Sequence, residues 1–204
     1  MSASSNPDPA NGRPAFLYGL IAVVVAVLIL ATGSFLWLSR GGNAGLVGGP
    51  FTLQDGNGKP VTDRDFRGKY LLVYFGYTFC PDVCPTTLTE VAEALDHLGP
   101  KADQLRAVFI TVDPKRDTPA VMKQYVASFP RLVGLTGAPE QIADVAQKYR
   151  VYYAEHRTGT GPNDYTMDHS SVLYLMGPDG RFIAPIRADA EGSQMAADLA
   201  RLMS

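Results

Sequence analysis

The two cysteines of this 204-residue chain lie close together, in the stretch YLLVYFGYTFCPDVCPTTLTEVAEAL. Cys80 and Cys84 are separated by three residues, and a proline follows each of them. The apolar run before them predicts a buried strand, and the periodic run after them predicts a helix. Pro85 suits a first helical turn, whereas Pro81 disfavours a regular helix across the whole motif. Cys80 is therefore expected in the loop and Cys84 at the start of the helix.

Two thiols at such a place can do two kinds of chemistry. The N–H groups and the dipole at a helix N-terminus favour the thiolate, which is the better metal ligand and the better nucleophile. As a dithiol/disulfide pair, the cysteines would exchange electrons with a partner. As a chelate, they would bind one soft cation if their sulfurs lie within about 4.6 Å, twice a typical metal–sulfur bond. Two core residues without chemistry are the third alternative.

A third ligand would favour the metal, and the chain has three histidines. His169 is expected at the start of a strand, after a polar loop. If strands and helices alternate around one sheet, loops entering the late hairpin lie on the side where the first helix begins, so His169 could approach both sulfurs. A solvated strand histidine is the alternative. His97, late in the first helix, and His156, in an expected loop, are weaker candidates.

Two thiolates and one imidazole suit copper better than structural zinc, which usually takes four ligands. Two acidic residues could assist such a site. Asp82 could tune the charge between the thiolates, and Asp168 could orient His169. Both are also ordinary turn residues.

Strands and helices must alternate to position these residues. Strands are expected within 51–62 (a hairpin), 69–77, 105–113 and 131–137, and as a pair within 169–186. Helices are expected within 87–99, 117–129, 138–150 and 191–203, with Thr118 as a cap and Pro119 at the first helical position. This order predicts an α/β fold of the thioredoxin-like type, with a central mixed sheet flanked by helices.

The N-terminal part has a different composition. Residues 15–38 form an uncharged apolar run of about 24 residues, longer than the roughly 20 that span a bilayer. A transmembrane anchor is predicted there, after a tail at 1–14, because the run is too long for a signal peptide. A glycine-rich flexible linker is expected at 39–50 and the folded domain at 51–204. The formal net charge of −2 gives no electrostatic footprint for nucleic acid.

Three motifs in this order resemble the Sco/SenC family: GYTFCPDVCPTTL, VDPKRDTPAVM and DHSSVLYLMGPDGRF. Its members are membrane-anchored, thioredoxin-like copper chaperones that assemble the dinuclear copper centre of cytochrome c oxidase. The resemblance extends from about residue 51 to the C-terminus. It implies that Cys80, Cys84 and His169 are copper ligands, and that the copper-site subunit of the oxidase is a partner.

The resemblance also implies an N-in, C-out topology, with the domain in the bacterial periplasm or the mitochondrial intermembrane space. No Arg- and Ser-rich presequence precedes residue 15, which favours the bacterial inner membrane. A thiol reductant and a copper donor are then required as further partners. For the 113–119 loop, capping and loop geometry are preferred to a partner contact.

Another class of function uses the same thiols. A thiol-disulfide oxidoreductase could reduce the copper-site cysteines of the oxidase, or act in redox signalling, with His169 incidental. An anchored scaffold with vestigial thiols is a third, non-catalytic alternative.

Overall fold

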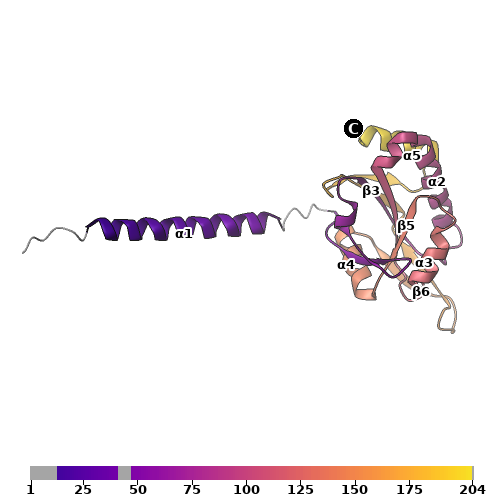
Figure 1. Cartoon of the computed structure of the whole chain (residues 1–204). Helices are drawn as coiled ribbons and strands as arrows, with labels where there is room; N and C mark the ends of the chain where they lie inside the picture. Colours follow the sequence, from indigo (N-terminus) through magenta and orange to yellow (C-terminus); the bar gives the residue numbers. More distant parts are fainter. Residues whose placement is uncertain (1–12, 41–46, 204) are drawn as a thin grey trace, which may run out of the picture. The chain divides into compact units, whose positions relative to one another are not determined.

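The computed structural model of the chain describes residues 13–40 and 47–203 (Figure 1). In the N-terminal helix, it describes the side chains of residues 18–30 and 32. The chain divides into two units, Met1–Asn43 and Ala44–Ser204.

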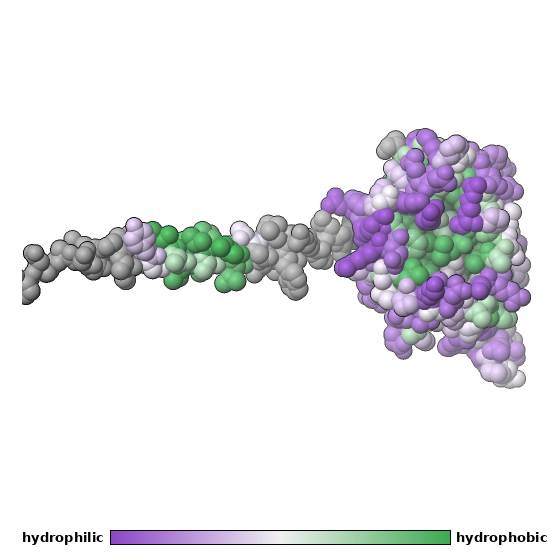
Figure 2. All heavy atoms as spheres, in the orientation of Figure 1, coloured by the Kyte–Doolittle hydropathy of each residue, from purple (hydrophilic) through white to green (hydrophobic). Residues whose placement is uncertain are grey.

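The first unit contains one helix, α1, which runs from Arg13 to Arg40. Its described side chains are mostly apolar and exposed (Figure 2). When only the described residues are counted, no helix is long and apolar enough to cross a membrane. The predicted tail (1–14) and linker (39–50) lie partly outside the described residues, which omit 1–12 and 41–46.

The second unit is built on a seven-stranded mixed sheet with the order β2-β1-β5-β4-β3-β8-β9. Strands β3, β4 and β5 are parallel to one another. The outer strands continue the sheet in antiparallel fashion at both edges. The strands are β1 (Thr52–Asp55), β2 (Pro60–Thr62), β3 (Tyr70–Gly76), β4 (Leu105–Thr111), β5 (Leu132–Thr136), β8 (Val172–Met176) and β9 (Phe182–Arg187). The predicted mixed central sheet is confirmed.

Helices flank this sheet on both faces. Adjacent residues of β3 point to opposite faces. Tyr74 packs towards Phe109 and through it towards Tyr125 of α3, with ring centroids 6.1 and 5.5 Å apart, whereas Phe75 packs on Tyr149 of α4 at 5.4 Å. The helices are α2 (Val83–Leu98), α3 (Pro119–Val126), α4 (Pro139–Tyr149) and α5 (Gly192–Leu202), with 3₁₀ turns η1 (Asp63–Phe66) and η2 (Gly99–Gln104).

The helix ends follow from local chemistry. The Val121 N–H donates to the Thr118 side chain, and Pro119 opens α3, as predicted. Gly99 ends α2 with a φ of 55°, a value that glycine adopts readily. Helix α2 packs beside α5 (Figure 1).

A separate two-stranded sheet pairs β6 (Tyr153–Arg157) with β7 (Tyr165–His169). The predicted polar loop, with Gly159, Gly161 and Pro162, lies at 158–164 between these two strands, but it leads into β7 and does not end directly at His169. His169 ends β7 instead of starting a strand, and His156 lies in β6 instead of a loop. The hydrophobic pattern misses both strands because β6 is largely exposed and only alternate residues of β7 are buried.

Candidate metal centre

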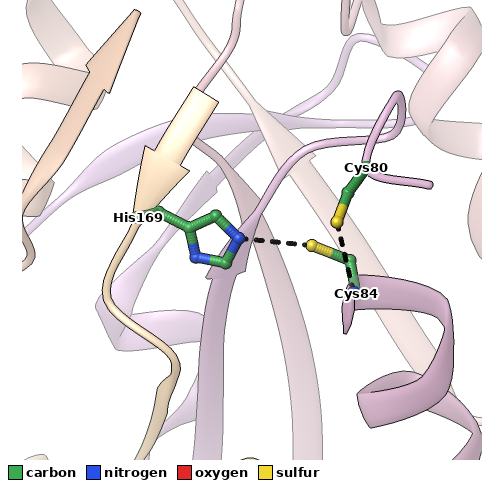
Figure 3. Close-up of side chains that lie close together, drawn as sticks. All are labelled: Cys80, Cys84 and His169. Atoms are coloured by element: carbon green, nitrogen blue, oxygen red, sulfur yellow. Dashed lines mark hydrogen bonds between the residues drawn. The ribbon is translucent and has the colours of Figure 1, made fainter. Parts of the chain in front are cut away.

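The two cysteines lie where the interior strand β3 ends and α2 begins (Figure 3). Cys80 is partly buried in the connecting loop, and Cys84 is the second residue of α2, with 0% of its surface exposed. The Cys84 N–H donates to the Cys80 Sγ at 3.4 Å, and both residues are free thiols. The predicted placement of the pair, one in the loop and one at the helix start, is confirmed.

The end of β3 approaches Cys84 very closely. A Cβ at Gly76 would lie 2.8 Å from the Cys84 Sγ and 2.7 Å from a ring carbon of Phe109. No real side chain tolerates such contacts without displacing its neighbours. Glycine at position 76 is therefore part of what sets the position of the Cys84 sulfur.

His169 reaches the cysteines from the end of β7 (Figure 3). Its Nε2 lies 3.4 Å from the Cys84 Sγ, and its Nδ1 lies 3.2 Å from the Ser170 carbonyl oxygen. A carbonyl can only accept, so Nδ1 carries the proton and Nε2 presents its lone pair to the sulfur. The rings of Tyr74 and Tyr77 stand edge-on to the imidazole, with centroids 6.0 and 6.1 Å away.

Burial controls the protonation of both groups. It raises the pKa of the Cys84 thiol to about 12 and lowers the pKa of His169. The thiolate that a helix N-terminus is expected to favour is therefore not the form of Cys84 in the metal-free protein, because burial is the largest influence on its pKa. The imidazole, by contrast, is already neutral, which is the form that ligates metals.

The three donor atoms fit a single metal ion. One ligand atom each from Cys80, Cys84 and His169 lies within 4.8 Å of the other two. Three ligands about 2.0–2.3 Å from one ion in a trigonal plane are about 3.5–4.0 Å apart, so small side-chain movements suffice. Two sulfurs and one imidazole are a soft donor set, which suits copper. Among the described residues, this is the one such cluster of ligand side chains.

The other predicted residues are not donors in this cluster. Asp82 precedes α2 and is exposed, and its side chain makes no capping hydrogen bond. Asp168 pairs with His156, with 2.9 Å between carboxylate oxygen and Nε2, while the Ser170 carbonyl contacts the Nδ1 of His169. His97 is exposed near the end of α2.

A buried carboxylate fixes the cysteine loop. Asp117 is 0% exposed and accepts hydrogen bonds from the backbone N–H of Thr78 (3.0 Å) and the hydroxyls of Thr78 and Thr111 (both 2.5 Å). Burial raises the pKa of Asp117, and these hydrogen bonds oppose that shift. Sequence reasoning treated the 113–119 loop as capping and loop geometry and missed this anchor. The available clue was an acidic pair, Asp113 and Asp117, directly after a buried strand.

A groove of about 450 Å³ adjoins the start of α2. It is lined by Asp82, Val83, Thr86, Thr87, Ser171, Ala188 and Asp189. Two apolar side chains of the cysteine segment are unusually exposed, Phe79 at 58% and Val83 at 48%. Apolar groups exposed beside a site are typical of a surface that another molecule covers.

Comparisons with known proteins agree with these features. The family model described as SCO1/SenC matches residues 40–204. The human "Protein SCO1 homolog, mitochondrial" is 41% identical over 165 residues, which are 78% of this chain and 53% of that protein. "Protein SCO2, mitochondrial" of Saccharomyces cerevisiae is 36% identical over 197 residues, 88% of this chain and 65% of that protein. The chain thus spans less than two thirds of the length of these curated relatives.

Two solved structures with copper bound are also similar. ScoI of Bradyrhizobium japonicum is 52% identical, with a TM-score of 0.70, over 77% of this chain and 99% of that chain. Yeast Sco1 is 36% identical, with a TM-score of 0.71, over 77% of this chain and 88% of that chain. Copper in these relatives matches the donor set of the cluster described above.

Proposed function

Because the chain belongs to the SCO1/SenC family, we propose that it is a copper carrier whose ligands are the sulfurs of Cys80 and Cys84 and the Nε2 of His169. The observation that carries this proposal is the convergence of these donor atoms within 4.8 Å of one another. The copper-bound relatives at 52% and 36% identity support it. Copper is the cargo of such a protein.

The three ligands have different tasks. The Ser170 carbonyl keeps the proton of His169 on Nδ1, so that Nε2 is free to bind. Cys84 must lose its proton on binding, because the thiolate is the ligand. Cys80 lies in the loop and is the more exposed of the two thiols. An incoming ligand of the recipient would therefore replace Cys80 first.

We further propose the copper-site subunit of cytochrome c oxidase, with its dinuclear copper centre, as the recipient. The family resemblance of the three motifs supports this, and the exposed Phe79 and Val83 beside the ligands offer a surface for such contact. A thiol reductant would keep the cysteine pair reduced outside the cytoplasm, and a copper donor would load it.

A single-pass anchor at residues 15–38 completes the proposal. Its support is the uncharged apolar run of about 24 residues in the sequence. With the linker at 39–50, it would hold the domain at the periplasmic face of a bacterial inner membrane, or alternatively in the mitochondrial intermembrane space. Alkaline extraction of membranes tests this: the full chain should stay with the lipid, and its release would contradict the anchor.

Copper titration tests the site itself. The reduced full chain, kept anaerobic in detergent, should bind one Cu(I) in competition with a chromophoric chelator. Cys80→Ser, Cys84→Ser and His169→Ala should each weaken binding by more than the about 10–100-fold typical of changes to a ligand's hydrogen-bond partner. His97→Ala, an exposed histidine on α2, is the matched control and should bind as the wild type does. Unchanged affinity in all three ligand variants would refute the assignment.

A thiol-disulfide oxidoreductase is the second candidate, because the two sulfurs are already close enough for a small loop movement to join them. Such an enzyme would use Cys80 and Cys84 and leave His169 without a task. Two results together would favour this function over copper transport. His169→Ala would reduce a disulfide substrate at the wild-type rate, and the wild type would bind copper only weakly.

A further inference from the structure

His169 lies at the junction of two sheets. It ends β7, and a two-residue connection joins it to β8, which pairs with β3 in the sheet that carries the cysteine loop. The rest of β7 pairs only with β6 among the described residues, in the separate two-stranded sheet. Side chains between β7 and the cysteine loop therefore add to the backbone connection in setting how the imidazole lies against the sulfurs.

Arg116, from the loop between β4 and α3, lies between these two parts. Its side chain is only 7% exposed and forms an ion pair with Asp113, which is 2% exposed. Its Nη1 donates to the Tyr165 carbonyl oxygen at 2.9 Å, at the first residue of β7. Its guanidinium lies over the Tyr165 ring, with Cζ 3.6 Å from the ring centroid. The Tyr165 hydroxyl in turn donates to Asp113 at 2.9 Å.

The same guanidinium contacts the cysteine loop. Its Cζ lies 4.7 Å from the ring centroid of Phe79, the residue before Cys80. It also lies 5.8 Å from the Tyr77 ring, and that ring stands edge-on to His169 at 6.1 Å. The guanidinium of Arg116 thus contacts the loop that carries the cysteines, the strand that carries His169 and an aromatic ring that packs on the imidazole.

We propose that Arg116 is a positioning residue, which holds β7 and the cysteine loop in the relative placement that lets Cys80, Cys84 and His169 bind one copper ion together. This inference rests on the copper-carrier function proposed above. A planar guanidinium can lie between two aromatic rings while it donates in its own plane, and a lysine ammonium cannot.

Stability alone explains this arrangement poorly. Within the described part of the chain, the buried Nη2 of Arg116 has no hydrogen-bond partner. A buried ion pair is often replaceable by apolar residues without loss of stability, and an unsatisfied donor adds a further cost. A geometrical task at the copper site accounts for keeping the cation there.

The test is a double-mutant cycle of Cu(I) affinity with Arg116→Lys and His169→Ala in the reduced full chain. Arg116→Lys keeps the charge and should weaken copper binding about tenfold, the scale of changes to residues that orient a ligand. In the His169→Ala background, the same substitution should have almost no effect, because the positioned ligand is gone. The matched control is Arg201→Lys, which alters an exposed ion pair with the same i,i+3 spacing and should leave affinity unchanged.

Equal weakening by Arg116→Lys in both backgrounds would overturn the inference, since it would show an effect on the thiolates or on the whole fold. If His169→Ala weakens Cu(I) binding but Arg116→Lys does not, the inference is also overturned. If His169→Ala itself leaves Cu(I) affinity unchanged, the proposed function is refuted instead.

A copper-free measurement complements the cycle. Hydrogen exchange of the β7 amides should become faster in Arg116→Lys, while exchange in β3 and β4 stays slow. If Arg116→Lys fails to fold, Tyr165→Leu, which removes the ring under the guanidinium, should give the same selective loss of protection. Unchanged exchange in β7 would contradict the positioning role.

Discussion

Copper binding to this site should strengthen at least tenfold for each unit by which the pH rises, because Cys84 must lose a proton first. Burial is the main cause that raises the pKa of Cys84 from an ordinary 9.0 to about 12. The metal-free thiol is therefore protonated throughout the neutral range, whereas its copper-bound form is the thiolate. His169 adds no proton there, since burial lowers its pKa and leaves the ring neutral.

The magnitude follows from the size of this shift. Below the pKa, the fraction of thiolate changes tenfold per pH unit, so affinity should rise about 100-fold between about pH 6.5 and 8.5 from Cys84 alone. Any proton released by Cys80 adds to this slope. Burial is the largest cause of this shift, so a thiol at Cys84 binds copper more weakly at neutral pH than an unshifted thiol would.

The assay is an anaerobic Cu(I) competition titration at several pH values, with proton release followed by an indicator in weak buffer. His169→Ala should bind copper more weakly, but the logarithm of its affinity should rise with pH at the same slope as in the wild type, because the imidazole releases no proton. In Cys84→Ser, this slope should fall by one, because one fewer proton is released. A flat affinity profile without proton release in the wild type would refute the reasoning, since Cys84 would then already be a thiolate in spite of its burial.

Two further predictions concern the frame of the site. Asp117→Asn should lower the free energy of unfolding by about 1–3 kcal/mol in chemical denaturation, because it disturbs several buried hydrogen bonds. Thr78→Val removes only the hydroxyl hydrogen bond to Asp117 and should lower the free energy of unfolding by about 1 kcal/mol. Equal losses of stability in Asp117→Asn and Thr78→Val would argue that Asp117 does not anchor the cysteine loop through several hydrogen bonds. Gly76→Ala should cost about 1–3 kcal/mol through overpacking against Cys84. It should also weaken copper binding by displacing that sulfur, and unchanged affinity would show that the sulfur position is not limiting.

The sequence alone predicted those parts of the fold that have strong local patterns. The apolar run of β3, the capped start of α3 at Thr118 and Pro119, and the central mixed sheet are confirmed. The family resemblance of the three motifs is confirmed by the match over residues 40–204. The ligand roles of the cysteines and His169 stay predictions, although their side chains do converge.

Other features depend on tertiary structure and cannot be predicted from the sequence alone. The β6–β7 hairpin has few buried positions, so hydrophobic alternation is too weak to reveal it. The protonation of Cys84 is set by how deeply the fold buries it, which local position at a helix start cannot show. The hydrogen bonds of Asp117 to Thr78 link residues 39 positions apart and become visible only in the folded chain.

The inequality of the two cysteines would suit the proposed transfer of copper. A permanent site gains from burying all its ligands, because solvent and competing ligands are then excluded. Here Cys84 is packed against Gly76 and the core, while Cys80 lies in a loop beside the exposed Phe79. In the proposed carrier, a competing thiolate would reach the metal on the Cys80 side while Cys84 and His169 still hold it. The energetic cost of an ionised Cys84 in its buried position would also limit affinity, so that a recipient with a less buried thiolate site would take the metal.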